Sequence, residues 1–541
     1  MADEKIVLEF KNTSLIALLV ILLVFFVLEL QVTIPNPITF GDEAFHTGMA
    51  RYIAIERDYP AWVTIAGTDN TGRINFAKPV MLNLLLSGFF LIFGFSETIV
   101  KFLIPFIPLV TSLAIYILVK SLYDGKIGFI AAIVFVSIPS VVTYSVTAYA
   151  EPLVTFYYSL SILLLLYSIK TGKQKYILLT GIFTALAFLT EVSSLTLIAF
   201  FFLAFFYNLV TKGSFPIKRY LPLFIIFVVL IIGFLIRNVY TYGTPICYLQ
   251  HTGIQFIDRF VDYPGCSYKT QKVSEPKFHY QGIRDQAGSD QSVYRMGITN
   301  FLDFAYGNIW FVVLGVFGGI VISLYKRDLI STLLVLVLPT YVLYFHFTSG
   351  RAEDAARNLL AWTPIFAIFT GIYFGRLYEF LQSHQKYIAV IVFLIVIILA
   401  YQNLTPKLSV MNQVKQFSPA FFEACDWTKE NLPRDAVLST VWVYRAAYSC
   451  ERTAVGNSPD IFLSKDLKLI KETADEDGIT HLFIQKFSLS NQAFSESYLI
   501  DSVEFFENNP SDFKKVFENG SPLQQCIQQG GCDGNIIYEI V

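Results

Sequence analysis

Long apolar runs decide the fold of this chain, and the first of them reads SLIALLVILLVFFVLELQV at residues 14–32. This run is long enough to cross a bilayer as a helix, which takes about 20 residues. The segment before it, MADEKIVLEFKNT, mixes acidic and basic residues, so we expect a retained first helix and not a cleavable signal peptide. The run therefore indicates an integral membrane protein.

The composition supports this interpretation. Of the 541 residues, 54% are hydrophobic and only 15% are charged, whereas a soluble protein carries about 25% charged residues. The 51 Phe and 31 Tyr residues fit apolar helices with aromatic belts at the membrane interfaces. The net charge of −2 is uninformative about nucleic acid, but the sequence has no basic domain and no known nucleic-acid-binding module, so no nucleic-acid partner is expected.

Further apolar runs predict a mainly α-helical, polytopic bundle of about eleven spans, because each span takes about 17–25 apolar residues. The runs lie at residues 14–34, 98–119, 127–143, 152–168, 175–190, 192–211, 219–236, 308–325, 329–347, 358–378 and 386–404. The run at 79–94 is short, and we expect a juxtamembrane or re-entrant helix there. Helices are expected throughout, since open sheet edges cannot be satisfied in lipid.

The positions of Lys and Arg predict the orientation. If the N-terminus is cytoplasmic and 79–94 does not cross, the basic short loops all face the cytoplasm, as the positive-inside rule requires. These loops hold Lys120, Lys126, Lys170, Lys173, Lys175, Lys212, Lys218, Arg219, Lys326, Arg327, Arg376 and Lys386. A crossing at 79–94 would turn them outward, so the bias argues against it.

The six cysteines then all lie outside the cytoplasm, where disulfides persist. Six cysteines allow 15 pairings. We expect nearest neighbours to pair, as 247–266, 425–450 and 526–532, and free buried thiols are the alternative.

The predicted organisation has two parts. Residues 1–404 form the transmembrane domain, with a first outer loop and juxtamembrane helices at 35–97 and a second outer loop at 237–307. Residues 405–541 form a small soluble α/β domain outside the cytoplasm. Its expected helices are 419–431 and 463–473, and its expected strands are 436–443, 481–485 and 536–541, an alternation typical of an α/β fold.

An acidic pair, Asp42-Glu43, opens an amphipathic helical stretch in the first outer loop. Asp42 could simply cap that helix. Alternatively, a carboxylate just outside the membrane can act as a base that takes a proton from an acceptor group. His46 could bind a metal with Asp42, but one pair at this spacing is weak evidence for a site of three or four ligands. A metal site is therefore not predicted.

Three outer positions could bind an anionic substrate. Lys78 precedes Pro79, which suits a first helical turn, and an anion there would offset the unfavourable placement of a lysine at a helix N-terminus. A snorkelling lysine is the alternative. Arg351 and Arg357 lie in a short outer loop before a span, where a guanidinium suits phosphate. The alternative is pairing with Glu353, Asp354 or another outer carboxylate.

Glu151 stands before Pro152 at the outer end of a span. A normal helix opening accounts for an acid-Pro pair, and Glu191, at another outer span end, can be read in the same way. An ionisable group at this depth is also a functional candidate. Arg237 and Lys101 are expected to mark span ends.

The order of these motifs resembles the GT-C superfamily of integral membrane glycosyltransferases, which use lipid-phosphate sugars. The resemblance points to the group of protein O-mannosyltransferases and lipid A aminoarabinose transferases. It rests on Gly41-Asp42-Glu43-Ala-Phe-His, Ala77-Lys78-Pro79, Tyr149-Ala150-Glu151-Pro152 and Arg357-Asn-Leu-Leu, and in layout it covers residues 14–404. The sequence departs from the family in two places. Lys78 is followed by a single proline and preceded by Ala77, where relatives often have a second proline and an acidic residue, and Glu151 stands where the family usually has Asp.

The resemblance implies a role for each matching residue. Asp42 would be the general base, with Glu43 in support. Lys78 and Arg357 would hold the donor phosphate, and Arg351 and His46 join them as candidate substrate-binding residues. Glu151 would contact donor or acceptor. No metal or cofactor is required, and a divalent cation is not indicated.

The expected function is therefore transfer of a sugar from a polyprenyl- or dolichyl-phosphate donor to a protein, lipid or glycan acceptor by inverting displacement. The missing tryptophan-rich signature argues against oligosaccharide transfer to asparagine. The expected location is the plasma membrane of a prokaryote or archaeon, with the C-terminal domain outside. The alternatives are a transporter or flippase for an anionic or lipid-linked substrate, against which no inverted repeat is found, and a non-catalytic scaffold.

Overall fold

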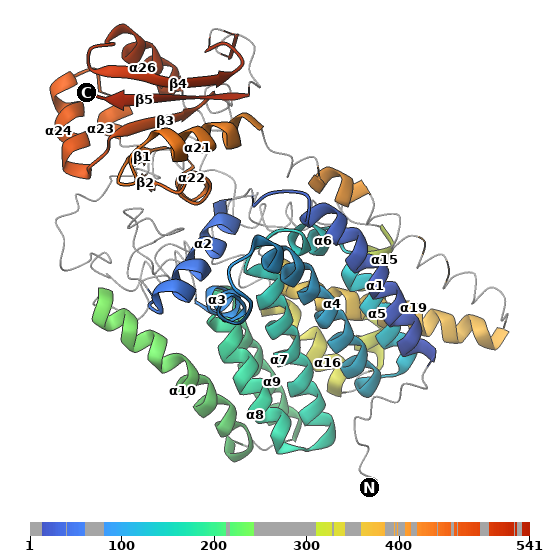
Figure 1. Ribbon diagram of the computed structural model, residues 1–541. Coiled ribbons are helices and arrows are strands. Elements are labelled where there is room, and N and C mark those ends of the chain that lie inside the picture. Colours follow the sequence, from blue (N-terminus) through green and yellow to red (C-terminus); the bar gives the residue numbers. More distant parts are fainter. Residues whose placement is uncertain are drawn as a thin grey trace.

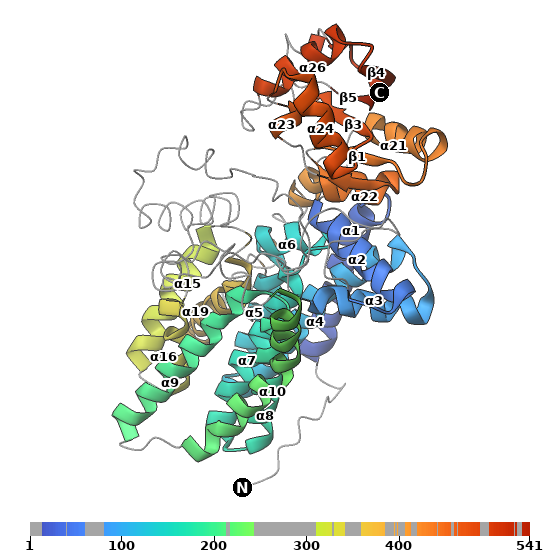
Figure 2. The ribbon, with the colours of Figure 1, turned by 90° about the vertical axis from the view of Figure 1, so that its left-hand side faces the viewer.

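The structure is a computed structural model. It describes residues 13–38, 41–59, 80–212, 217–242, 310–326, 329–340, 357, 359–384, 394, 398, 406–412, 419–440, 442–455, 459–462, 464–486, 497–523, 525–526 and 533–541. The chain forms a helix bundle with a mixed sheet at one end (Figures 1 and 2).

The bundle is formed by the helices from α1 to α19. They are α1 (Thr13–Thr33), α2 (Gly41–Glu56), α3 (Met81–Phe93), α4 (Glu97–Leu122), α5 (Gly125–Ser137), α6 (Pro139–Ser145), α7 (Glu151–Thr171), α8 (Gln174–Phe188), η1 (Val192–Leu195), α9 (Thr196–Lys212), α10 (Ile217–Tyr242), α15 (Trp310–Lys326), α16 (Leu329–Val335), η2 (Leu359–Trp362) and α19 (Thr363–His384). The predicted mainly helical bundle is therefore confirmed.

Five of these helices are long and apolar enough to span a membrane individually: α1, α4, α7, α10 and the segment Leu359–Gln382. The helices α3, α8, α9, α15 and α16 are apolar but shorter. The predicted count of about eleven spans is thus not confirmed. The predicted span 386–404 falls almost entirely outside the described residues.

The predicted span 127–143 is broken into α5 and α6, which meet at 62°. Pro139 causes the break, because the residue before a proline is pushed out of the helical region. Ile138 accordingly has an extended backbone, with φ −64° and ψ 123°. The break turns α6 toward the segment that leads into α7.

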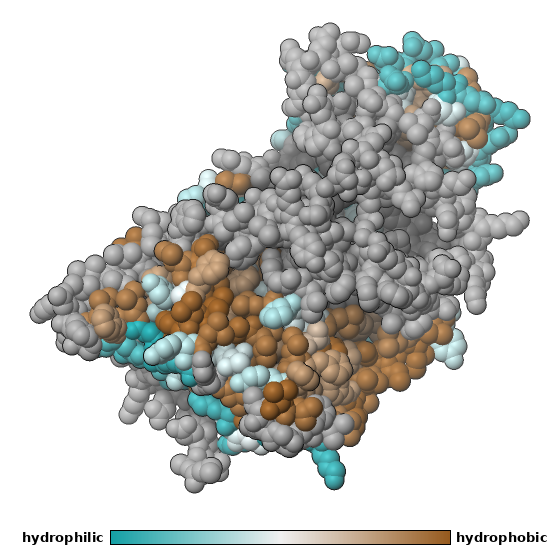
Figure 3. Space-filling model, turned by 180° about the vertical axis from the view of Figure 1, so that it is seen from behind, coloured by the Kyte–Doolittle hydropathy of each residue, from teal (hydrophilic) through white to brown (hydrophobic). Residues whose placement is uncertain are grey.

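Burial distinguishes a central helix from peripheral ones. In α7, 83% of the most apolar window is buried, against 22% in α10. On α10, Val229 is 63% exposed and Ile232 is 47% exposed, as expected for side chains that face lipid. Figure 3 shows hydrophobic residues over much of the coloured bundle surface and hydrophilic residues over most of the coloured sheet region.

Close packing holds α19 against two neighbours, α5 and α15. A Cβ atom on Gly319 of α15 would lie 2.1 Å from the backbone oxygen of Phe369 in α19. A Cβ atom on Gly371 of α19 would lie 2.8 Å from the backbone oxygen of Ile127 in α5. Small residues let membrane helices approach this closely. The packing fixes the helix that directly follows Arg357.

The C-terminal region forms a five-stranded mixed sheet. Its elements are α21 (Pro419–Asn431), β1 (Val437–Ser439), α22 (Val443–Cys450), β2 (Thr453–Val455), α23 (Pro459–Phe462), α24 (Leu467–Asp477), β3 (His481–Gln485), α26 (Ser497–Asn508), β4 (Phe513–Gly520) and β5 (Gly534–Ile540). The strand order is β2-β1-β3-β5-β4. Strand β1 is parallel to β2 and β3, and β5 is antiparallel to β3 and β4.

The expected small sheet with helices is confirmed here, and three predicted elements have other bounds. The strand predicted at 536–541 is Gly534–Ile540. The run predicted as strand 436–443 ends as a strand at Ser439, and Val443 begins α22. The helix predicted at 463–473 starts later, because the Asp466 side chain accepts from the backbone N–H groups of Lys468 and Leu469 as a helix cap. It ends at Gly478, whose φ of +67° suits glycine. The proposed division at residue 404 stays a prediction.

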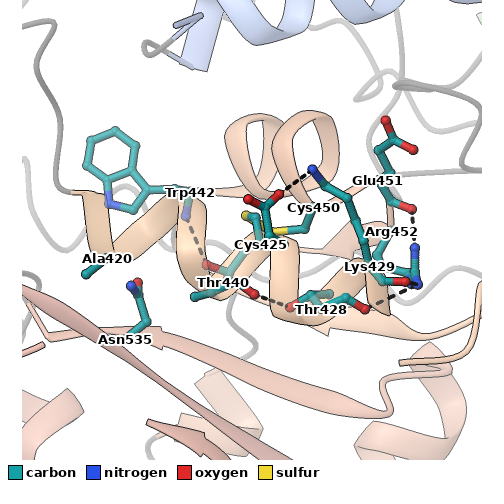
Figure 4. The surroundings of a disulfide bond; sticks show 12 residues. Ala420, Cys425, Thr428, Lys429, Thr440, Trp442, Cys450, Glu451, Arg452 and Asn535 are labelled. Atoms are coloured by element: carbon teal, nitrogen blue, oxygen red, sulfur yellow. Dashed lines mark hydrogen bonds and ion pairs between the residues drawn. A yellow bond between two sulfur atoms is a disulfide. The ribbon is translucent and has the colours of Figure 1, made fainter. Parts of the chain in front are cut away.

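A disulfide joins Cys425 of α21 to Cys450 of α22 (Figure 4), which confirms the pairing expected for these two cysteines. Beside it, the Arg452 guanidinium donates to the backbone oxygens of Thr428, Lys429 and Leu432. Cys526 is also disulfide-bonded, but the expected partner Cys532 and the expected pair 247–266 lie outside the described residues.

Candidate functional site

The helix α2 carries the acidic pair at its start. Asp42 and Glu43 lie in its first turn, where carboxylates stabilise a helix through its dipole. The helix begins at Gly41, so Asp42 lies within the first turn and not at the flanking cap position. Most of the helix is buried, and Glu43 is only 1% exposed. A carboxylate so buried needs specific partners.

Arg357 lies between two carboxylates from distant parts of the chain. Its Nη1 is 2.8 Å from Oδ2 of Asp42, and its Nε donates to Oε1 of Glu151. Its guanidinium also lies over the Tyr149 ring, 4.7 Å from the centroid. The structure thus brings together three of the predicted site residues, which are separated by more than a hundred positions in sequence.

The charges around Arg357 keep it protonated. Burial alone would lower its pKa, but Glu151 and Asp42 raise the pKa well above the ordinary value. Burial raises the pKa of Tyr149, and the charge of Asp42 raises it further. Tyr149 is therefore a neutral phenol beside this charged group, and it can act as a hydrogen-bond donor.

The short segment between α6 and α7 is held at three points. Ser145 Oγ donates to Oε1 of Glu29 at 2.6 Å, the Ala148 backbone N–H donates to Oε1 of Glu43 at 2.9 Å, and Glu151 accepts from Arg357. Each contact comes from a different helix or loop. The acidic pair and Arg357 therefore share one structural task, which is to fix residues 145–151.

Glu29 and Tyr149 were missed as site residues from sequence. Glu29 is the only charged residue in the run 14–32, and an intramembrane carboxylate is a functional candidate by default, so that signal was present. It is 3% exposed and bonded to Ser145. Tyr149 has no comparable signal, because one tyrosine among 31 is not distinguishable by type.

Glu151 has one buried oxygen that the described residues leave without a hydrogen-bond donor. Glu151 is 5% exposed, and among the described residues its buried Oε2 has no hydrogen-bond partner. Leaving a buried carboxylate oxygen without a donor is unfavourable. A substrate hydroxyl would satisfy this oxygen.

His46 faces a different set of polar groups. Its Nδ1 lies 2.7 Å from Oδ1 of Asn83, a fully buried residue of α3. Asn83 Nδ2 donates to the Tyr59 hydroxyl at 3.4 Å, and the Arg237 guanidinium lies 4.8 Å from the centroid of the Tyr59 ring. His46 thus helps to join α2 to α3. Arg237 takes part in this arrangement at the end of α10, beyond merely marking a span end.

Two predicted site residues, Lys78 and Arg351, lie outside the described residues. In the part of the chain that the structure describes, no group of three or more His, Cys, Asp or Glu residues could hold a metal ion. The predicted roles of all seven site residues stay predictions.

The fold and site together define a membrane helix bundle with an arginine held between two carboxylates. One of these carboxylates is on α2, which packs on α22 of the C-terminal region. Residues 77–236 match the family model described as dolichyl-phosphate-mannose-protein mannosyltransferase. No curated protein sequence matches the chain.

Solved structures share the fold over nearly the whole chain. The apo structure of ArnT from Cupriavidus metallidurans has a TM-score of 0.65 at 9% identity, over 97% of this chain and 98% of that chain. ArnT bound to undecaprenyl phosphate has a TM-score of 0.58 at 9% identity, over 97% and 98%. The apo oligosaccharyltransferase of Archaeoglobus fulgidus has a TM-score of 0.60 at 12% identity, over 97% and 74%. The expected resemblance to GT-C membrane glycosyltransferases is confirmed, and the protein is an integral membrane protein of that fold.

Proposed function

We propose that the protein is a glycosyltransferase that moves a hexosyl or pentosyl group from a polyprenyl- or dolichyl-phosphate donor to an acceptor outside the cytoplasm. The observation that carries the proposal is the joint placement of Asp42, Arg357 and Glu151. The match of residues 77–236 to a mannosyltransferase family model supports the class of reaction.

The donor class is supported by the ligands of structures with the same fold. One ArnT structure is bound to undecaprenyl phosphate. The Archaeoglobus fulgidus oligosaccharyltransferase AglB, at 11% identity over 94% of this chain and 73% of that chain with a TM-score of 0.59, is in complex with an inhibitory peptide and a dolichol-phosphate. Both ligands are lipid phosphates, and a lipid-phosphate donor would suit an integral membrane enzyme. The acceptor is a protein, lipid or glycan.

In the proposed reaction, an acceptor hydroxyl or amine attacks the sugar carbon, and the bond to the donor phosphate breaks. Asp42 takes the acceptor proton, and the lipid phosphate leaves with the electron pair of the broken bond. Attack opposite the leaving group inverts the configuration at the sugar carbon. Glu151 Oε2, which has no partner among the described residues, accepts from a hydroxyl of donor or acceptor.

The phosphate is assigned to Lys78, with Arg351 and Arg357 as further cationic groups, because stabilising the charge that develops on a leaving group is a large catalytic term. Arg357 has a second role. Its ion pair holds the Asp42 carboxylate in one orientation, 2.8 Å from Nη1. Such preorganisation places the base where the acceptor must approach. The proposal requires no metal or cofactor.

A transfer assay on the purified protein in nanodiscs tests the proposal. Radiolabelled polyprenyl- and dolichyl-phosphate sugars are incubated with pooled protein, lipid and glycan acceptors. We expect label to move to one acceptor class with equimolar release of the lipid phosphate. Movement of intact donor across a proteoliposome membrane, with no cleavage of the sugar–phosphate bond, would contradict the proposal and indicate a flippase.

A further inference from the structure

Among the described residues, a helix of the C-terminal region packs against the helix that carries the acidic pair. Helix α22 packs on α2, and the two lie side by side in both ribbon views (Figures 1 and 2). The Tyr444 ring meets the Phe45 ring at a centroid distance of 5.2 Å. The Tyr448 hydroxyl donates to Oε1 of Glu97 at 2.8 Å. These contacts join α22 to α2, two residues from Glu43, and to the first turn of α4.

Arg445 lies between these two tyrosines on α22 and is buried. It is 2% exposed, and its guanidinium lies 4.3 Å from the centroid of the Phe421 ring. Burial lowers the pKa of Arg445 to about 9, and attraction to Glu43 opposes this effect. At neutral pH the guanidinium is therefore a buried cation that interacts with the buried Glu43 carboxylate.

Glu43 connects this cation to the site. Its Oε1 accepts from the Ala148 backbone N–H, in the segment that leads to Tyr149 and Glu151. Charge attraction from a neighbouring cation holds a carboxylate in place, and a carboxylate held in place keeps its hydrogen bond to a backbone N–H. Arg445 thus strengthens the contact that fixes the segment carrying Glu151.

The disulfide limits the movement of α22. Cys450 ends this helix and is bonded to Cys425 of α21, and Phe421 of the same α21 packs under Arg445. The helix is therefore anchored to the sheet region on one side and to α2 on the other. A side chain held in this way keeps a fixed position relative to Glu43.

We propose that Arg445 is a positioning residue, by which the C-terminal region orders the transferase site through Glu43 and the Ala148 backbone N–H. The inference rests on the proposed function, and it assigns the C-terminal region a part in catalysis. Arg445 does not touch substrate. Its loss lowers kcat and leaves the KM for the lipid-phosphate donor near its original value, because the phosphate is bound elsewhere.

The test is a double-mutant cycle on the full chain in nanodiscs, with Arg445→Met, Glu43→Gln and the combination. We expect each single variant to lower kcat at least about ten-fold with little change in donor KM. The kcat of the double variant should be no lower than that of the less active single variant, since the effects of coupled residues are not additive. Arg445→Lys, which keeps the charge, should recover part of the loss. Tyr448→Phe is the matched control on the same helix, and its kcat should stay within about two-fold.

Two results would overturn the inference. One is a kcat for Arg445→Met within two-fold of the unchanged enzyme. The other is losses in the two single variants that multiply in the double variant. Arg445→Gln carries the same expectation should Arg445→Met not fold. The coupling is also measured as the free energy of unfolding of the four proteins, which needs no transfer activity. If the two residues are coupled in stability but the unchanged protein shows no transfer, the proposed function is contradicted and the interaction between Arg445 and Glu43 is still supported.

Discussion

At the scale of the residue, the site depends on one guanidinium shared by two carboxylates. Arg357 pairs with Asp42 and Glu151 and lies over the Tyr149 ring. A planar guanidinium can pair with two carboxylates and stack on an aromatic ring at the same time, whereas the ammonium group of lysine is a single point charge. The sequence could nominate all three charged residues, because ionisable groups at the membrane edge are few. It could not show that they pair with one another.

Arg357→Lys should therefore be a severe change although it keeps the charge. Lysine cannot hold both carboxylates and stack on Tyr149, so we expect Asp42 to lose its fixed orientation and transfer to fall about 100-fold. The measurement is kcat in the nanodisc transfer assay, with thermal unfolding as a check of the fold. Transfer within a factor of three of the original enzyme would show that Arg357 does not orient the base.

At the scale of the element, the sequence pattern predicted the positions of helices more accurately than the points at which helices are interrupted. The expected strand 481–485 and helix 419–431 appear with those bounds, because their apolar patterns are strong and their ends carry turn signals. Strand β4 was not predicted, since it lies at the sheet edge and its adjacent Lys514 and Lys515 interrupt the apolar pattern. Charged residues on an edge strand obscure the alternation of apolar and polar residues by which a strand is recognised in a sequence. The predicted span 127–143 is divided at Pro139 into α5 and α6. Apolar content alone does not reveal this break.

The close approach of α15 and α19 gives a prediction for Gly319→Ala. The new Cβ atom would lie 2.1 Å from the backbone oxygen of Phe369, so the helices must separate. We expect a loss of about 1–3 kcal/mol in stability, measured by thermal unfolding in detergent. Gly233→Ala on α10 is the control, because a Cβ atom there meets nothing within 4 Å among the described residues. Equal stability of the two variants would show that the α15–α19 contact is not tight.

The strand β3 gives a prediction of acid sensitivity. Burial lowers the pKa of His481 from its ordinary value of 6.5, although Glu539 opposes the shift. As the pH falls through 6.5, the unfolded chain takes up this proton before the folded chain does, so the free energy of unfolding decreases with falling pH. His481→Gln should remove this part of the pH dependence. Identical unfolding curves against pH for both proteins would contradict the assignment.

At the scale of the whole molecule, the sheet region and the bundle are joined through α22 on α2, and the candidate site lies close to this junction. Sequence reasoning placed the acidic pair, Glu151 and Arg357 on one side of the membrane through the positive-inside rule. It assigned the C-terminal region no role in catalysis, because the packing of α22 on α2 joins segments that are far apart in the sequence. The class of fold followed from apolar runs and motif order, since both are local features.

The predicted orientation can be checked with single cysteines. Among the described residues the native cysteines are in disulfides, so an added thiol can be labelled selectively. Lys126→Cys, in an expected cytoplasmic loop, should resist a membrane-impermeant maleimide in intact cells and react after permeabilisation. Lys468→Cys, whose native side chain is 82% exposed in α24, should react in intact cells. The reverse pattern would invert the topology and place the acidic pair inside.

The most direct test of the central claim is Asp42→Asn in the transfer assay. Asparagine keeps the shape of the side chain but cannot accept the acceptor proton, so we expect kcat to fall by about 10²–10⁴ while the protein still folds and binds the lipid phosphate. Asp426→Asn is the control, because the side chain of Asp426 is 67% exposed on α21, and it should transfer normally. Transfer by Asp42→Asn at the rate of the unchanged protein would contradict the account.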